Sequence, residues 1–178
     1  MRWRSLTHTW SALRARRATR WALDLAMVAL VLVAVQAWQT RAHLRGDAPD
    51  LELRDLDGRT VTLASLAGKP VMVAFFAPWC GVCRANEGAV AQLARVAGEQ
   101  AHVVSVASDY RGVDEIRAYV DEHHVPAPVL LGGNGTARAW RVQAFPTYYF
   151  LDERGRVTGS SVGYTTTAGM AARLFALP

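Results

Sequence analysis

Residues 75–84 read Phe75-Phe76-Ala77-Pro78-Trp79-Cys80-Gly81-Val82-Cys83-Arg84. They hold the only two cysteines of the 178-residue chain. The apolar run 71–76 leads into the pair, and apolar residues at helical spacing follow it as far as residue 97. This order predicts a buried strand that delivers Cys80 to a helix N-terminus, where free N–H groups and the helix dipole stabilise a thiolate. Cys83 then lies one turn later, near enough to close a disulfide.

The cysteine spacing favours dithiol redox chemistry over the other uses of two cysteines. We predict that Cys80 is the nucleophile and that Cys83 resolves the mixed disulfide. A static disulfide explains little, because so short a loop hardly restricts the unfolded chain. A zinc site normally needs four ligands, and haem attachment would need histidine where Arg84 stands. The sequence therefore predicts no metal and no cofactor, with the adjacent His123 and His124 on a solvated helix end.

The N-terminal region has the pattern of a membrane anchor. Six arginines and no acidic residue precede residue 21. An apolar run of 18 residues follows, from Trp21 to Trp38, with Asp24 and Gln36 each near an end. At about 1.5 Å per residue this run just spans a hydrocarbon core, and the arginines place the N-terminus in the cytoplasm. A cleaved signal peptide and a buried core helix are the alternatives, and the long basic segment and flanking tryptophans favour an uncleaved anchor.

The overall charge gives no reason to expect nucleic acid as a partner. The formal net charge is +5, but without the six N-terminal arginines the chain carries 14 basic and 15 acidic residues. We expect four parts: a cytoplasmic basic tail (1–20), a transmembrane anchor (21–38), a polar linker (39–50) and a folded domain (51–178).

Within residues 51–178 the patterns predict an α/β domain. Alternating residues on both sides of Asp57-Gly58 predict a hairpin, and the fully apolar run 71–76 predicts a central strand covered on both faces by helices. The remaining elements are expected in this order: helix 84–97, strand 102–106, helix 112–123, extended segment 125–131, short helix 136–140, strands 148–151 and 156–158, and helix 165–177.

Several short segments together resemble a known family. Besides the cysteine pair they are Asp55-Leu56-Asp57-Gly58, Leu66-Ala67-Gly68-Lys69-Pro70, Glu87-Gly88, Phe145-Pro146-Thr147 and Val162-Gly163-Tyr164-Thr165-Thr166. On these residues the chain resembles the thioredoxin superfamily. Within it, the chain is similar to the membrane-anchored TlpA-like and cytochrome-maturation thioredoxins, and above all to the protein D family of the suppressor-of-copper-sensitivity system.

The resemblance implies a thioredoxin-like fold, a central mixed sheet flanked by helices, with the hairpin as an N-terminal extension. It also implies that Pro146 is cis and faces the cysteines, where it offers backbone groups to an extended substrate and discourages metal capture. The residues expected to contact substrate are Trp79, Gly81, Val82, Phe145 and Pro146.

Three positions depart from the family pattern. Thioredoxins carry a buried acid where this chain has Ala74, and TlpA-like proteins carry a glutamate where it has Asn86, with Glu87 next. Asparagine cannot take up and release a proton as glutamate does. In this chain that proton is carried by Glu87, by water or by no group. Ala144 stands where the family usually has a glycine, two residues before the cis-proline. The bulky Phe145 should narrow the substrate groove.

These observations predict a protein-disulfide oxidoreductase anchored in the inner membrane, with its domain in the periplasm, where disulfides persist. Its substrates would be protein thiols and disulfides, and a membrane electron-transfer partner would restore its redox state. The resemblance favours the reducing or isomerising direction. The alternative is a dithiol binding module, a metallochaperone in copper stress or cytochrome maturation.

Overall fold

The computed structural model describes residues 21, 23–31, 33–35, 44–126 and 128–176 of the chain. The chain divides into two units, Met1–Gln39 and Thr40–Pro178. In the first unit the described residues between 21 and 35 are helical and exposed. In the described ranges, no helix combines the length and the apolar character needed to cross a membrane. The expected tail 1–20 and residues 36–43 lie outside the described residues.

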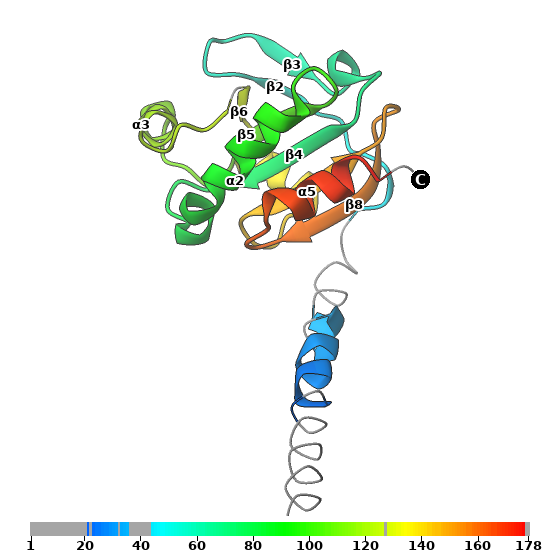
Figure 1. Cartoon of the computed structure of the whole chain (residues 1–178). Helices are drawn as coiled ribbons and strands as arrows, with labels where there is room; N and C mark the ends of the chain where they lie inside the picture. The colour runs from blue at the N-terminus through cyan, green and yellow to red at the C-terminus, as the bar shows by residue number, and fades with distance from the viewer. Residues whose placement is uncertain (1–20, 22, 32, 36–43, 127, 177–178) are drawn as a thin grey trace, which may run out of the picture. The chain divides into compact units, whose positions relative to one another are not determined.

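The second unit is built on a six-stranded sheet in the order β1-β8-β7-β4-β5-β6 (Figure 1). The strand that precedes the cysteines, β4, pairs in parallel with β5 and antiparallel with β7, so the sheet is mixed, as predicted. Every residue of β4 is buried, which explains why its sequence is apolar throughout rather than alternating. The strands are β1 (Gly46–Asp47), β4 (Val71–Phe76), β5 (His102–Ala107), β6 (Val129–Leu131), β7 (Thr147–Leu151) and β8 (Arg156–Val162).

Helices cover one face of the sheet. The long helix α2 (Gly81–Ala97) and the last helix α5 (Thr167–Leu174) lie side by side across it (Figure 1). Their apolar sides meet alternate residues of β4 in one cluster that includes Met72, Leu93 and Met170. A third helix, α3 (Val113–His123), packs at the end of β4 where the cysteines lie, in a cluster that contains both cysteines.

The opposite face is covered mainly by the N-terminal extension rather than by helices, which corrects the expectation of helices on both sides. The predicted hairpin is present as β2 (Glu52–Arg54) and β3 (Thr60–Thr62), followed by the short 3₁₀ helix η1 (Ala64–Leu66). Residues flanking these elements pack with Trp140, which caps α4 (Gly133–Ala139), around Phe75 and Tyr149.

The structure adds two elements that the sequence pattern did not predict, η1 and a short strand before the hairpin. Residues 46–47, expected to be linker, form β1 and pair with Val157 and Arg156 of β8. Leu44 and Ala48 pack on the core beside this strand. Ordered structure therefore begins before Leu51.

Candidate active site

Cys80 is the N-cap of α2, directly after the turn that follows β4. Its sulfur accepts a hydrogen bond from the backbone N–H of Cys83 at 3.3 Å. The Cys80 thiol also donates to the backbone oxygen of Phe145 at 3.4 Å. A cysteine in an N-cap position meets the free N–H groups of the first helical turn, so the local geometry matches the predicted arrangement.

Cys83 lies in the first turn of α2 and is 1% exposed, against 6% for Cys80. Both cysteines are free thiols. Burial raises the pKa of the Cys83 thiol well above its ordinary value, and the neighbouring Cys80 and Glu87 raise it further. Cys83 is therefore held as a protonated thiol, and it must lose this proton before it can attack another sulfur.

The loop before β7 faces the cysteines. The Phe145–Pro146 peptide bond is cis, as the resemblance implied. Pro146 is buried, and its carbonyl oxygen accepts a hydrogen bond from the N–H of Gly163 at 2.8 Å. Thr147 anchors the loop from the other side, because its hydroxyl donates to the carbonyl of Ala144. The loop thus presents the backbone of residue 145 to the Cys80 sulfur.

Exposed apolar side chains come from the segments around Cys80. Trp79, Val82 and Tyr164 are 59%, 45% and 63% exposed. The ring of Phe145 meets the Trp79 indole edge-on, with centroids 6.0 Å apart. Exposed apolar side chains gathered in this way are typical of a surface that binds another protein. Of the five residues expected to contact substrate, Trp79 and Val82 belong to this surface and Phe145 contacts Trp79, whereas Gly81 begins α2 and Pro146 is buried.

Asp109 holds the Trp79 indole in place. The indole N–H lies 2.9 Å from the Asp109 carboxylate and 3.1 Å from its backbone oxygen, and Asn134 donates to the same carboxylate. Asp109 has a positive φ of 48°, a conformation that aspartate tolerates better than most residues. Sequence reasoning missed this contact, because nothing in the pattern relates residue 109 to residue 79.

Asn86, which stands where the family carries glutamate, has a structural role here. It is fully buried, and its amide donates to the Tyr148 hydroxyl at 2.7 Å. Its side-chain oxygen accepts from the N–H of Thr165 at 3.1 Å. Asn86 therefore ties α2 to β7 and to the segment that leads into α5.

An Asn86→Ala variant is expected to lose about 3 kcal/mol of unfolding free energy, because two buried polar groups lose their partner. Urea unfolding measures this loss. The control is Asn134→Ala at an exposed position, expected to change stability by less than about 0.5 kcal/mol. Equal losses in the two variants would contradict the role of Asn86.

Glu87 is the buried acid of the site. It is 6% exposed, and the Tyr119 hydroxyl of α3 donates to its carboxylate at 3.0 Å. Burial raises the pKa of Glu87 to about 7, and the hydrogen bond from Tyr119 partly opposes this shift. Cys83 and Glu87 are four residues apart on α2 and so share one side of the helix.

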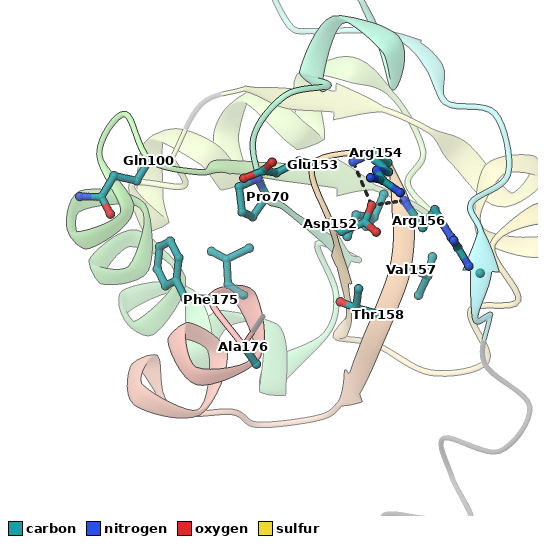
Figure 2. A pocket seen from close by; sticks show the side chains of 13 residues that line it. Pro70, Gln100, Asp152, Glu153, Arg154, Arg156, Val157, Thr158, Phe175 and Ala176 are labelled. Atoms are coloured by element: carbon teal, nitrogen blue, oxygen red, sulfur yellow. Dashed lines mark hydrogen bonds between the residues drawn. The ribbon is translucent and has the colours of Figure 1, made fainter. Parts of the chain in front are cut away.

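Two further features bear on which chemistry the chain can support. A hollow of about 760 Å³ lies at the opposite end of β4 from the cysteines, lined by Pro70, Arg156 and Phe175 among others (Figure 2). It contains none of the predicted site residues. Among the described residues, no three side chains of the types His, Cys, Asp and Glu come together as a metal site.

Comparisons with known proteins agree with this geometry. Residues 44–160 match the AhpC/TSA family. The thioredoxin-like protein YneN of Bacillus subtilis is 32% identical over 129 residues, which cover 71% of this chain and 76% of YneN. The thiol-disulfide oxidoreductase ResA of Oceanobacillus iheyensis is 28% identical over 145 residues, 73% of this chain and 75% of ResA.

A solved structure shows the same fold. The structure of MTB DsbF in its mixed oxidized and reduced forms superposes with a TM-score of 0.66 and 27% identity. The match covers 74% of this chain and 99% of DsbF. The thioredoxin-like fold expected from the sequence is confirmed, whereas the finer likeness to the copper-sensitivity protein D family stays a prediction. With its strand–cysteine pair–helix and its matching relatives, this chain belongs to the thioredoxin-like AhpC/TSA family and is a thiol–disulfide oxidoreductase.

Proposed function

We propose that this chain reduces or isomerises disulfides in other proteins outside the cytoplasmic membrane, held there by residues 21–38. The N-terminus would be cytoplasmic and the folded domain periplasmic. The observation that carries the proposal is the position of Cys80. Its sulfur lies between the first turn of α2 and the backbone of Phe145, bordered by the exposed Trp79 and Val82.

The surface around Cys80 suits a protein substrate. An extended segment can lie along the loop of residues 144–146, while its apolar side chains contact Trp79, Val82 and Tyr164. Cys80 attacks the substrate disulfide and forms a mixed disulfide with it. Cys83 then attacks Cys80, which releases the substrate as a thiol and leaves a Cys80–Cys83 disulfide. A membrane partner must deliver two electrons to restore the dithiol.

The reducing or isomerising direction is supported by the resemblance to the TlpA-like and cytochrome-maturation thioredoxins. A strongly oxidising dithiol protein is one whose reduced form is stabilised, commonly as a thiolate. Burial raises the pKa of Cys83 and keeps this residue as a thiol in the reduced protein, so the reduction potential decides the direction.

The proposed location is supported by the N-terminal unit. Large apolar side chains between residues 21 and 35, such as Leu23, Leu25 and Val33, are exposed on the helix. Apolar surface of this kind is favourable in a lipid environment and costly in water. The arginine-rich segment before it gives the orientation.

Equilibration with glutathione tests the direction. We expect a reduction potential below that of glutathione and near the value of about −270 mV that is typical of thioredoxin. A value close to the roughly −120 mV of DsbA would overturn the reducing role. Tight binding of stoichiometric Cu(I) without any thiol exchange would favour the metallochaperone instead.

Labelling in cells tests the location. The full chain is produced in a Gram-negative bacterium, and a membrane-impermeant maleimide is added to cells whose outer membrane has been opened. We expect Cys80 to be labelled and the protein to sediment with membranes, and a variant that lacks residues 2–38 to remain unlabelled in the cytoplasm. Recovery of the full chain as unlabelled cytosolic protein would contradict the proposal.

A further inference from the structure

Disulfide exchange requires a proton acceptor close to Cys83. The second cysteine is buried among apolar residues of β4 and α3, such as Phe76 and Ile116. A thiol in such surroundings does not ionise readily, and it attacks only as a thiolate. Ala74 and Asn86, at the two positions considered above, cannot take up a proton. The structure must supply another acceptor or leave this step to solvent.

We propose that the Glu87 carboxylate accepts the proton of the Cys83 thiol, and that Tyr119 positions this carboxylate. The proposal deepens the exchange reaction assigned to Cys80 and rests on it. Glu87 lies one helical turn beyond Cys83 and interacts with it electrostatically. The carboxylate is buried, so it faces the protein interior rather than bulk solvent.

Tyr119 fixes the carboxylate from the neighbouring helix. Its hydroxyl donates to Glu87 at 3.0 Å, and its ring stacks on Phe76 with centroids 5.1 Å apart. On its other side the Tyr119 ring contacts His123 edge-on at 4.6 Å. The tyrosine is therefore held between a strand residue and a helix residue, and it holds one carboxylate oxygen in a set direction.

The groups that face Glu87 come from three elements. On α2 this is Cys83, with Cys80 at the N-cap of the helix; on α3 it is Tyr119, with His123 beside its ring; and on β7 it is Tyr148. Burial raises the pKa of both tyrosines, so they stay neutral while Glu87 titrates. The Glu87 carboxyl group, with a pKa of about 7, carries negative charge and can bind a proton near neutral pH.

In the resolving step the Cys83 thiol transfers its proton to Glu87, and the resulting thiolate attacks Cys80 in the mixed disulfide. The bond between Cys80 and the substrate sulfur breaks, and the substrate leaves as a thiolate with the electron pair. The two cysteines lose two electrons and the substrate disulfide gains them. In the reverse reaction the protonated Glu87 returns its proton to Cys83.

Ellman's reagent separates the two steps, because attack by Cys80 releases one aromatic thiol and resolution by Cys83 releases a second. In the native protein we expect the second phase to slow as the pH falls below about 7, when Glu87 becomes protonated. Glu87→Gln should lose this inflection and slow the second phase about 100-fold at pH 8. The first phase should change little.

Tyr119→Phe provides a second, independent readout. This variant keeps the ring that stacks on Phe76 but removes the hydrogen bond that stabilises the Glu87 carboxylate. The pKa of Glu87 should therefore rise, and the pH inflection in the rate of the second phase should move to higher pH. Glu99→Gln, at an exposed site just beyond α2, is the matched control and should leave both phases unchanged.

The outcomes distinguish this inference from the exchange reaction itself. Failure of the native protein to release any aromatic thiol would remove the exchange reaction on which the inference rests. The role of Glu87 would be overturned if Glu87→Gln showed two normal phases and the same pH inflection of the second phase as the native protein. The role of Tyr119 would be overturned if the inflection in Tyr119→Phe stayed at the native pH. Neither result would affect the exchange reaction itself.

Discussion

A Cys83→Ser variant is expected to accumulate a mixed disulfide through Cys80, and a Cys80→Ser variant to lose exchange altogether. Cys80 borders the exposed surface formed by Trp79 and Val82, whereas Cys83 lies beneath it with 1% of its surface exposed. An incoming disulfide therefore meets Cys80 first. A serine hydroxyl at residue 83 cannot attack the mixed disulfide, so the adduct persists.

Mass spectrometry under non-reducing conditions measures this result. Each variant is incubated with a peptide that contains one disulfide, and the adduct is mapped to its cysteine after proteolysis. The double variant Cys80→Ser/Cys83→Ser is the control and should carry no adduct. An adduct that forms on Cys83 in the Cys80→Ser variant as fast as on Cys80 in the other would reverse the assigned roles.

Glu87 is expected to make the native protein less stable as the pH rises. The pKa of its carboxyl group is about 7 in the folded protein, against an ordinary value of 4.5, so between these values the folded state binds the proton and the unfolded state releases it. The stabilisation from this proton is present in full below about pH 4.5 and is lost as the pH rises through about 7. The loss approaches roughly 3 kcal/mol at 1.36 kcal/mol per pH unit.

Replacing Glu87 with glutamine removes this dependence, because glutamine is neutral at every pH. Urea unfolding of the reduced proteins at pH 4.5 and pH 8 measures the effect. Relative to the native protein, Glu87→Gln should gain roughly 3 kcal/mol of unfolding free energy between the two pH values. Glu99→Gln, with its exposed carboxyl group, should follow the native protein. Parallel curves for Glu87→Gln and the native protein would show that Glu87 does not titrate in this range.

The elements that could be predicted from the sequence are those with a strong local signal. The apolar run of β4 and the helical spacing of α2 gave their positions within a few residues, since burial alone sets these patterns. The end of β8 was missed, because Gly159-Ser160-Ser161 has weak strand character and is held by pairing with β7. The last helix was predicted to begin at Thr165, whereas Thr166 caps it.

The candidate site divides in the same way. The cysteine pair and the proline loop were visible in the sequence because their residue types and spacing are distinctive. The contact between Glu87 and Tyr119 was not, because it joins two helices whose relative rotation depends on the packing of the whole core. Trp79 and Asp109 are likewise 30 residues apart and meet only where two loops follow neighbouring strands.

The short strand β1 decides where a soluble fragment of this protein should begin. A fragment cut at Leu51, where the sequence first shows strand character, would lack the two residues that pair with the start of β8. The start of β8 would then be an open edge that a strand from a second molecule can pair with, and such open edges promote aggregation. Leu44 and Ala48 would also be lost from the core. Recombinant work on the domain is therefore better started at or before residue 44.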